Sequence, residues 1–204
     1  MKCPLKMIIY FTIISKKSLK EKLLLYIIVA LKAEAQSFVE RYRLQKSKID
    51  NFILFTNDNI KLIISGMGVE NARNATQALI NNFDITDEDI YLNIGICGAS
   101  KSYEIGELLE IGTISYNEIN YTLDTTKECI VCVDKPISQD IYKLVDMESY
   151  GFYDAIKHNP AIKTSHIFKI VSDHFEPEKV TKEHAKMLIF NKIDDINTLI
   201  FSKD

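Results

Sequence analysis

The stretch YLNIGICGAS, residues 91–100, runs from an apolar, β-rich segment directly into two closely spaced glycines. The stretch LIISGMGVENA, residues 62–72, repeats this design. The chain holds only seven glycines, so two such pairs are informative. Glycine adopts positive φ without strain and lets a ligand approach the backbone, so each pair predicts a tight turn that follows a strand. Neither stretch fits GxGxxG or a P-loop, and ordinary strand-to-helix turns are the alternative.

Apolar, β-rich runs and helical stretches alternate on both sides of these two segments. The runs predicted as strands are 25–31, 52–55, 62–65, 90–94, 108–115, 129–133, 143–147 and 167–171. The predicted helices are 33–43, 70–82, 149–158 and 179–201. This order predicts an α/β fold: a single-domain three-layer sandwich whose central mixed sheet is flanked by helices. The domain is expected to span 25–204, after an N-terminal extension, 1–24, to which the sequence assigns no role.

Composition narrows the classes of function. A chain of 204 residues with 47% hydrophobic and 26% charged residues suits one globular domain. A net charge of −3 gives no footprint for nucleic acid, so a small-molecule ligand is expected. The apolar run Met7–Ile14 is about half the length of a membrane span and lacks a small-residue cleavage site. We therefore expect no membrane association. For this run, an added strand, or residues that the domain needs upstream of its start, is favoured over a signal peptide.

The four cysteines suggest neither a metal site nor a disulfide framework. Cys129 and Cys132 have CxxC spacing, but they fall in a predicted strand, where residues three apart point to opposite faces. The four histidines also lack metal-ligand spacing. We expect no metal, no cofactor and reduced cysteines, which favours a cytoplasmic location.

Chemistry is expected where the strands end, because ligands of α/β sheets collect at the carboxyl ends of strands. Glu34, Asp173 and the acid pair of VDMES, residues 145–149, all lie at such ends. Glu34 could equally be a first-turn helix acid, and Asp173 a turn residue. Glu148 beside the apolar Met147 is harder to explain structurally, since an acid at a buried position needs a partner. We expect Asp146 to support it and Ser149 to cap the next helix.

The order of these motifs resembles the nucleoside phosphorylase and nucleosidase superfamily, especially methylthioadenosine/S-adenosylhomocysteine nucleosidase-like hydrolases. The resemblance covers roughly residues 25–201. It is carried by five motifs: VALKAEA (29–35), SGMGVENA (65–72), NIGICGAS followed by IGELLEIGTIS (93–115), VDMES (145–149) and VSD (171–173).

The resemblance implies a role for each matching residue and a homodimer. Glu34 corresponds to the acid that orients the attacking water, and Asp173, after Ser172, to the aspartate that protonates or hydrogen-bonds the purine. Met147 corresponds to the methionine packed against the ribose, and Glu148 to the glutamate that binds the ribose hydroxyls. The remaining substrate-binding positions are Gly68, Ile96, Cys97, Gly98 and Ser172.

Hydrolysis of the N-glycosidic bond is the favoured reaction. Cleavage builds positive charge on the sugar and negative charge on the base, which suits carboxylates near the ribose and an acid near the base. Phosphorolysis needs fixed cationic donors for a dianion. Compared with hexameric phosphorylases, this chain has Asn93 in place of an arginine and Ile96 in place of a serine.

The chain departs from the family between residues 116 and 144, which are fewer than usual. This region normally supplies an aromatic contact to the base, and KPISQDIYK, residues 135–143, leaves little room for a helix. A phosphate-dependent phosphorylase and a non-catalytic nucleoside-binding protein are therefore the two alternatives to a purine nucleosidase.

Overall fold

The computed structural model describes residues 23–201. The predicted N-terminal extension, 1–24, and the run Met7–Ile14 lie almost wholly outside the described residues. None of the helices found in residues 23–201 has both the length and the apolar character that a membrane span requires.

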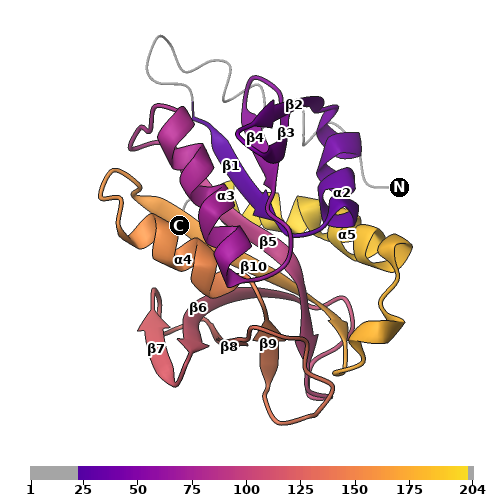
Figure 1. Cartoon of the computed structure of the whole chain (residues 1–204). Coiled ribbons are helices and arrows are strands. Elements are labelled where there is room, and N and C mark those ends of the chain that lie inside the picture. The colour runs from indigo at the N-terminus through magenta and orange to yellow at the C-terminus, as the bar shows by residue number, and fades with distance from the viewer. Residues whose placement is uncertain (1–22, 202–204) are drawn as a thin grey trace.

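In this part of the chain, ten strands form one mixed sheet with four α-helices around it, and this confirms the predicted α/β class (Figure 1). The strands are β1 (Leu25–Val29), β2 (Gln45–Ile49), β3 (Phe52–Thr56), β4 (Ile60–Ile64), β5 (Ile90–Ala99), β6 (Leu108–Tyr116), β7 (Ile119–Thr122), β8 (Glu128–Cys132), β9 (Leu144–Asp146) and β10 (Thr164–Asp173). The helices are α2 (Lys32–Tyr42), α3 (Val69–Asn82), α4 (Ser149–Lys157) and α5 (Lys182–Phe201), with a 3-10 turn, η1 (Pro177–Lys179).

The sheet is open at one end and closed on itself at the other. Strands β2, β3, β4, β1 and β5 follow one another in an open sheet, in which β4, β1 and β5 are parallel. From β5 onward the pairings close a ring: β5 pairs with β10, β10 with β6, β6 with β8, β8 with β9, and β9 again with β5. The ring brings the ends of β5, β9 and β10 together, and β1 lies beside β5.

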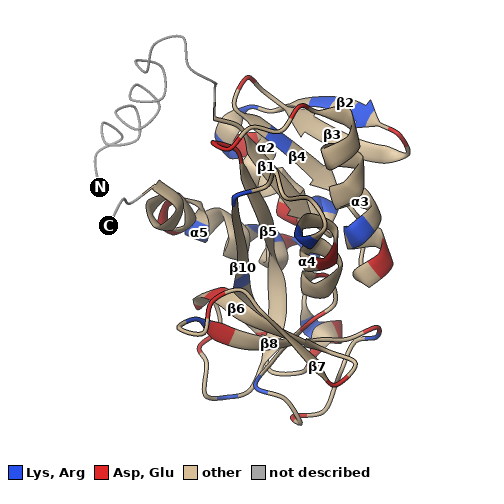
Figure 2. Cartoon of the chain, turned by 90° about the vertical axis from the view of Figure 1, so that its left-hand side faces the viewer, with Lys and Arg blue, Asp and Glu red and all other residues tan. Residues whose placement is uncertain are grey.

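Helices cover both faces of the open part of the sheet, and alternation along β1 shows why the strands are apolar throughout. Tyr26 and Ile28 pack in the cluster that includes residues of α3 and α4, whereas Ile27 and Val29 pack in the cluster of α2 and α5. Successive residues of a strand point to opposite faces, so a strand covered on both faces must be apolar at every position. In the ribbon of Figure 2, acidic and basic residues are interspersed over helices, strands and loops.

Helices α3 and α4 approach each other unusually closely at Gly151. A Cβ atom added there would lie 2.0 Å from the carbonyl oxygen of Val69, in the first turn of α3. Any side chain at this position would push the two helices apart. The contact matters for function because it holds the start of α3 against the start of α4.

The structure corrects three local predictions. Gly95 and Gly98 lie inside β5 and not in a turn, because β5 stays paired with β10 as far as Gly98, with a shift of register between Val171 and Asp173. Two strands, β2 and β7, were not predicted, since QKSKI and INYT are mostly exposed and lack an apolar run. The last helix begins at Lys182 and not at Lys179, because 177–179 form η1 and Val180 is extended. The turn at Gly66 and Gly68 is confirmed, and both glycines have positive φ.

We predict that Gly151→Ala lowers the free energy of unfolding by about 1–3 kcal/mol or more, because the added methyl group overpacks the contact with Val69. Urea titration followed by circular dichroism measures the change. The control is Asn74→Ala on the exposed side of α3, which should alter stability by less than about 0.5 kcal/mol. Equal stability of Gly151→Ala and the wild type would show that the helices separate at no cost.

Candidate functional site

A cavity of about 270 Å³ opens where β1, β5, β9 and β10 end. Eight of the nine residues predicted from the sequence to form the site line it: Glu34, Ile96, Cys97, Gly98, Met147, Glu148, Ser172 and Asp173. The ninth, Gly68, lines a neighbouring cavity of about 410 Å³, and its backbone N–H reaches Glu148. The structure thus brings these residues together from five separate segments of the chain, while their roles stay predictions.

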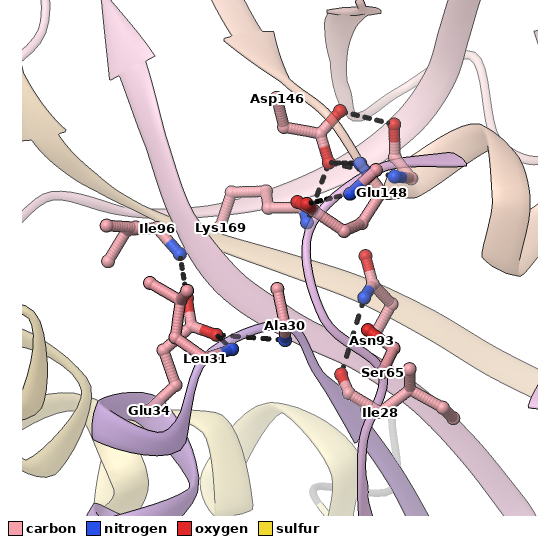
Figure 3. Close-up of polar contacts among 12 residues, drawn as sticks. Ile28, Ala30, Leu31, Glu34, Ser65, Asn93, Ile96, Asp146, Glu148 and Lys169 are labelled. Atoms are coloured by element: carbon pink, nitrogen blue, oxygen red, sulfur yellow. Dashed lines mark hydrogen bonds and ion pairs between the residues drawn. The ribbon is translucent and has the colours of Figure 1, made fainter. Parts of the chain in front are cut away.

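Glu34 is buried with 1% of its surface exposed, and its carboxylate is held by three backbone N–H groups. Oε2 accepts hydrogen bonds from Ala30 at 3.0 Å and Leu31 at 2.8 Å, and Oε1 accepts one from Ile96 at 3.0 Å (Figure 3). The bond to Leu31 caps the start of α2, so Glu34 is a first-turn helix acid and also a cavity residue. Burial raises the pKa of Glu34, and the three N–H groups and the nearby Lys169 offset this only in part.

Glu148 lies on the opposite side of the site at the start of α4. Its Oε1 accepts a hydrogen bond of 2.9 Å from the backbone N–H of Gly68, immediately before α3. The close approach of α3 and α4 at Gly151 makes this contact possible. Burial raises the pKa of Glu148 to about 7, with Lys169 and the Gly68 N–H opposing the shift and Asp146 and Glu34 adding to it.

Lys169 was not identified from the sequence, and it is the cation of the site. Its side chain is 1% exposed, and Nζ lies 2.8 Å from Asp146 Oδ2. Burial disfavours the ammonium, but the surrounding carboxyl groups outweigh burial and raise the pKa of Lys169. The signal was present in the sequence: a lysine interrupts the apolar run 167–171 of a strand that is otherwise buried.

Gly95 of β5 explains how the two sides of the site meet. Gly95 is paired in register with Lys169, and a Cβ added at Gly95 would lie 3.2 Å from Glu34 Oε1 and 3.6 Å from Lys169 Nζ. The sequence suggested that Gly95 serves a turn, and the structure shows that it does not. Its missing side chain is the space into which the carboxylate and the ammonium fit.

Asp146, and not Ser149 as predicted, caps helix α4. Ser149 is the first helical residue, and its backbone N–H donates to Asp146 Oδ2 at 2.8 Å while its hydroxyl donates to Oδ1 at 2.6 Å. A carboxylate that accepts the first free N–H groups of a helix does the work of a cap. The expected supporting role of Asp146 thus takes a definite form in the structure.

Asp173 ends β10 at the rim of the cavity. Its Oδ1 accepts the backbone N–H of Glu176 at 2.8 Å, and its Oδ2 lies 2.6 Å from the hydroxyl of Ser172. The same hydroxyl lies 3.1 Å from the carbonyl oxygen of Cys97, and its single proton serves one acceptor at a time. Asp173 is therefore fixed in orientation. It is also a turn residue, which is the alternative role that the sequence left open for it.

The part of the cavity lining that comes from the loops after β8 and β10 is aliphatic. It consists of Val133, Pro136, Ile137, Pro177 and Val180, and no aromatic side chain of the described chain lines the cavity. The short loop between β8 and β9, which holds no helix, supplies three of these residues. This agrees with the missing aromatic contact that the sequence indicated.

Metal ligands are not gathered at this site or elsewhere in the described residues. No group of three His, Cys, Asp or Glu side chains within 23–201 is arranged to hold a metal ion. Cys129 is exposed and Cys132 is buried, which confirms that the CxxC pair points to opposite faces of β8.

Comparison with known proteins supports the fold by structure and not by sequence. No family model matches the sequence, and no curated protein matches it. The structure is similar to 5′-methylthioadenosine/S-adenosylhomocysteine nucleosidase from Helicobacter pylori, solved with butyl-thio-DADMe-Immucillin-A. The TM-score is 0.73 at 12% identity, over 88% of this chain and 99% of that one.

Two further structures have the same architecture. Futalosine hydrolase of Helicobacter pylori matches with a TM-score of 0.72 at 12% identity, over 87% of this chain and 97% of its own. The 5′-methylthioadenosine nucleosidase of Arabidopsis thaliana matches with a TM-score of 0.69 at 16% identity, over 89% and 97%. The chain therefore has the fold of these nucleosidases, as its motifs predicted.

Ionisation of Glu148 should destabilise the folded protein. The folded-state pKa of about 7 lies above the ordinary value of 4.5, so the folded state binds the proton more tightly and stability falls as the pH rises between these values. Relative to Glu148→Gln, the wild type should lose on the order of 2–3 kcal/mol between about pH 5 and pH 8. Urea titrations at several pH values measure this difference.

The exposed Glu178→Gln is the matched control, and it should keep the pH dependence of the wild type. If Glu148→Gln also followed the wild type at every pH, the buried carboxyl group would not titrate in this range.

Proposed function

We propose that this protein hydrolyses the N-glycosidic bond of a purine nucleoside, of the methylthioadenosine or adenosylhomocysteine kind, and releases the free base. The observation that carries the proposal is the cavity in which Glu34, Glu148 and Asp173 meet at the ends of three different elements. The fold shared with three nucleosidases or hydrolases of nucleosides supports it.

The three carboxyl groups suit the three tasks of the reaction. Glu148 would accept hydrogen bonds from the ribose hydroxyls, with Met147 packed against the sugar. As the bond between the sugar and the base breaks, its electron pair passes to the base, and Asp173 would donate a proton or a hydrogen bond to the purine ring. Glu34 would take a proton from the water whose oxygen bonds to the sugar carbon.

Occupation of the backbone N–H groups favours water over phosphate as the nucleophile. Three N–H groups that could bind an anion already bind the carboxylate of Glu34. Asn93 is buried and donates to the carbonyl oxygen of Ile28 at 3.3 Å. Arg73 of α3 lines the neighbouring cavity and not this one, and it forms an ion pair of 2.6 Å with Asp154. A phosphate dianion would meet carboxyl groups and a single lysine.

One observation favours the alternative of a non-catalytic nucleoside-binding protein. The loop between β8 and β9 is short and holds no helix, while the cavity itself is kept, as in a protein that binds without turnover. Saturable binding of a nucleoside without release of base would establish this alternative.

The first test is chromatography of methylthioadenosine, adenosylhomocysteine, adenosine and inosine incubated with the protein, with and without phosphate. We expect equal release of free base in both conditions. Glu148→Gln and Asp173→Asn should each lower kcat/KM by about 100-fold or more, because each removes a group used in the transition state. Asp140→Asn, in the exposed loop before β9, is the control and should keep full activity. Strict dependence on phosphate, with pentose 1-phosphate as product, would replace hydrolysis by phosphorolysis.

The second test concerns Glu34. Glu34→Ala should lower kcat by about 10²–10⁴-fold, and it should cost about 1 kcal/mol of stability because the start of α2 loses its cap. The substitution also frees the N–H groups of Ala30, Leu31 and Ile96. Formate is small enough to occupy the vacated place, so we expect it to restore part of the activity. Unchanged activity of Glu34→Ala would remove Glu34 from the mechanism.

A further inference from the structure

We propose that Asp146 and Lys169 are positioning residues that act through Glu148: their buried ion pair fixes where the Glu148 carboxyl group lies and whether it is charged when the ribose arrives. The inference rests on the proposed function, which assigns the ribose hydroxyls to Glu148. It gives Lys169 a role and makes the expected supporting role of Asp146 specific.

Asp146 holds the backbone from which Glu148 projects. Its Oδ2 accepts the N–H of Ser149 at 2.8 Å and that of Glu148 at 3.3 Å, and the same oxygen lies 2.8 Å from Lys169 Nζ (Figure 3). Both carboxylate oxygens are therefore engaged, since Oδ1 accepts from the Ser149 hydroxyl. One side chain thus joins the end of β9, the start of α4 and the cation on β10.

Lys169 acts mainly through its charge. Figure 3 shows its side chain extending toward Asp146 and Glu148. The approach to Asp146 is an ion-pair contact, and no acceptor in the described chain receives a well-aligned hydrogen bond from Nζ. A buried ammonium that is held by charge exerts a strong field on its neighbours, because little water screens it.

The groups that face Glu148 come from every element around it. Glu34 approaches from α2, Asp146 from β9 and Lys169 from β10, and the start of α3 contributes the Gly68 N–H. Strand β5 contributes Cys97 to the same cavity, and burial raises the pKa of this thiol, so that it is neutral. Three carboxyl groups thus meet one ammonium, and the charge of Glu148 depends on the balance between Asp146, which disfavours it, and Lys169, which favours it.

This balance predicts opposite effects from the two partners of one ion pair. Asp146→Asn removes a negative neighbour and releases Lys169 toward Glu148, so Glu148 should ionise at lower pH. Lys169→Met removes the positive neighbour, so Glu148 should ionise at higher pH. If the pair had a purely structural role, both variants would be impaired alike, and the ionisation of Glu148 would not shift in opposite directions in the two.

The experiment measures the acid limb of kcat/KM against pH for the wild type, Asp146→Asn and Lys169→Met, with methylthioadenosine as substrate. We expect the limb to shift to lower pH by about one unit in Asp146→Asn and to higher pH by about one unit in Lys169→Met. Each shift corresponds to a tenfold change in the acid constant of Glu148. A shift in the same direction, or no shift in either variant, would overturn the proposal.

Breaking a buried ion pair can prevent folding, so the double variant Asp146→Asn with Lys169→Met is included. It leaves neither charge of this ion pair without its partner, and its acid limb should lie between those of the single variants. The matched control is Glu40→Gln with Lys186→Met, which removes an exposed ion pair of 2.7 Å and should leave the limb in place. A limb of the double variant outside the range of the single variants would also overturn the proposal.

Infrared titration separates this proposal from the proposed function. The carbonyl band of protonated Glu148, assigned by its loss in Glu148→Gln, reports its ionisation without any substrate. If no nucleoside were hydrolysed, the proposed function would fail. Opposite shifts in the pH at which this band disappears in the two variants would still support the action of the pair on Glu148. If these pH values did not shift in opposite directions, the action of the pair on Glu148 would be refuted, even in an active enzyme.

Discussion

The ammonium of Lys169 is buried in the middle of the sheet, and the residues around it follow from that fact. Removing such a charge from water costs several kcal/mol unless a partner of opposite charge lies close, and Asp146 is that partner at 2.8 Å. Because Asp146 also caps α4, the cation and the helix are fixed by the same carboxylate. The helix start then places Glu148 against the first residues of α3. The site is therefore built around its charge balance as much as around its shape.

Much of the fold could be predicted from the sequence because each buried strand is an apolar run, and these runs alternate with amphipathic stretches. The strands that escaped prediction, β2 and β7, are mostly exposed and are defined by backbone pairing, which leaves no apolar pattern. The closed ring could not be foreseen either. It depends on pairings such as that of β9 with β5, which join segments far apart in the sequence.

The candidate site was predictable where short motifs sit at strand ends, and unpredictable where a partner comes from elsewhere. Glu34, Glu148 and Asp173 could be selected because acids after apolar runs are conspicuous. Lys169 has its meaning only through Asp146, which lies 23 positions earlier in the sequence and on another strand. Gly95 shows the same limit. The sequence shows a glycine there, but the need for a glycine comes from the side chains of Glu34 and Lys169, which only the fold brings beside it.

Closure of the ring also limits the places where a further strand could pair with the sheet. Within the described chain every ring strand has partners on both sides, so the sheet ends only at β2 and at the short β7. The edge at β2 carries Lys46 and Lys48, both exposed. A further strand laid against it would confine two ammonium groups, which is a recognised protection against edge-to-edge aggregation. The polar strand that adds little to the core thus disfavours pairing of this sheet edge with another sheet.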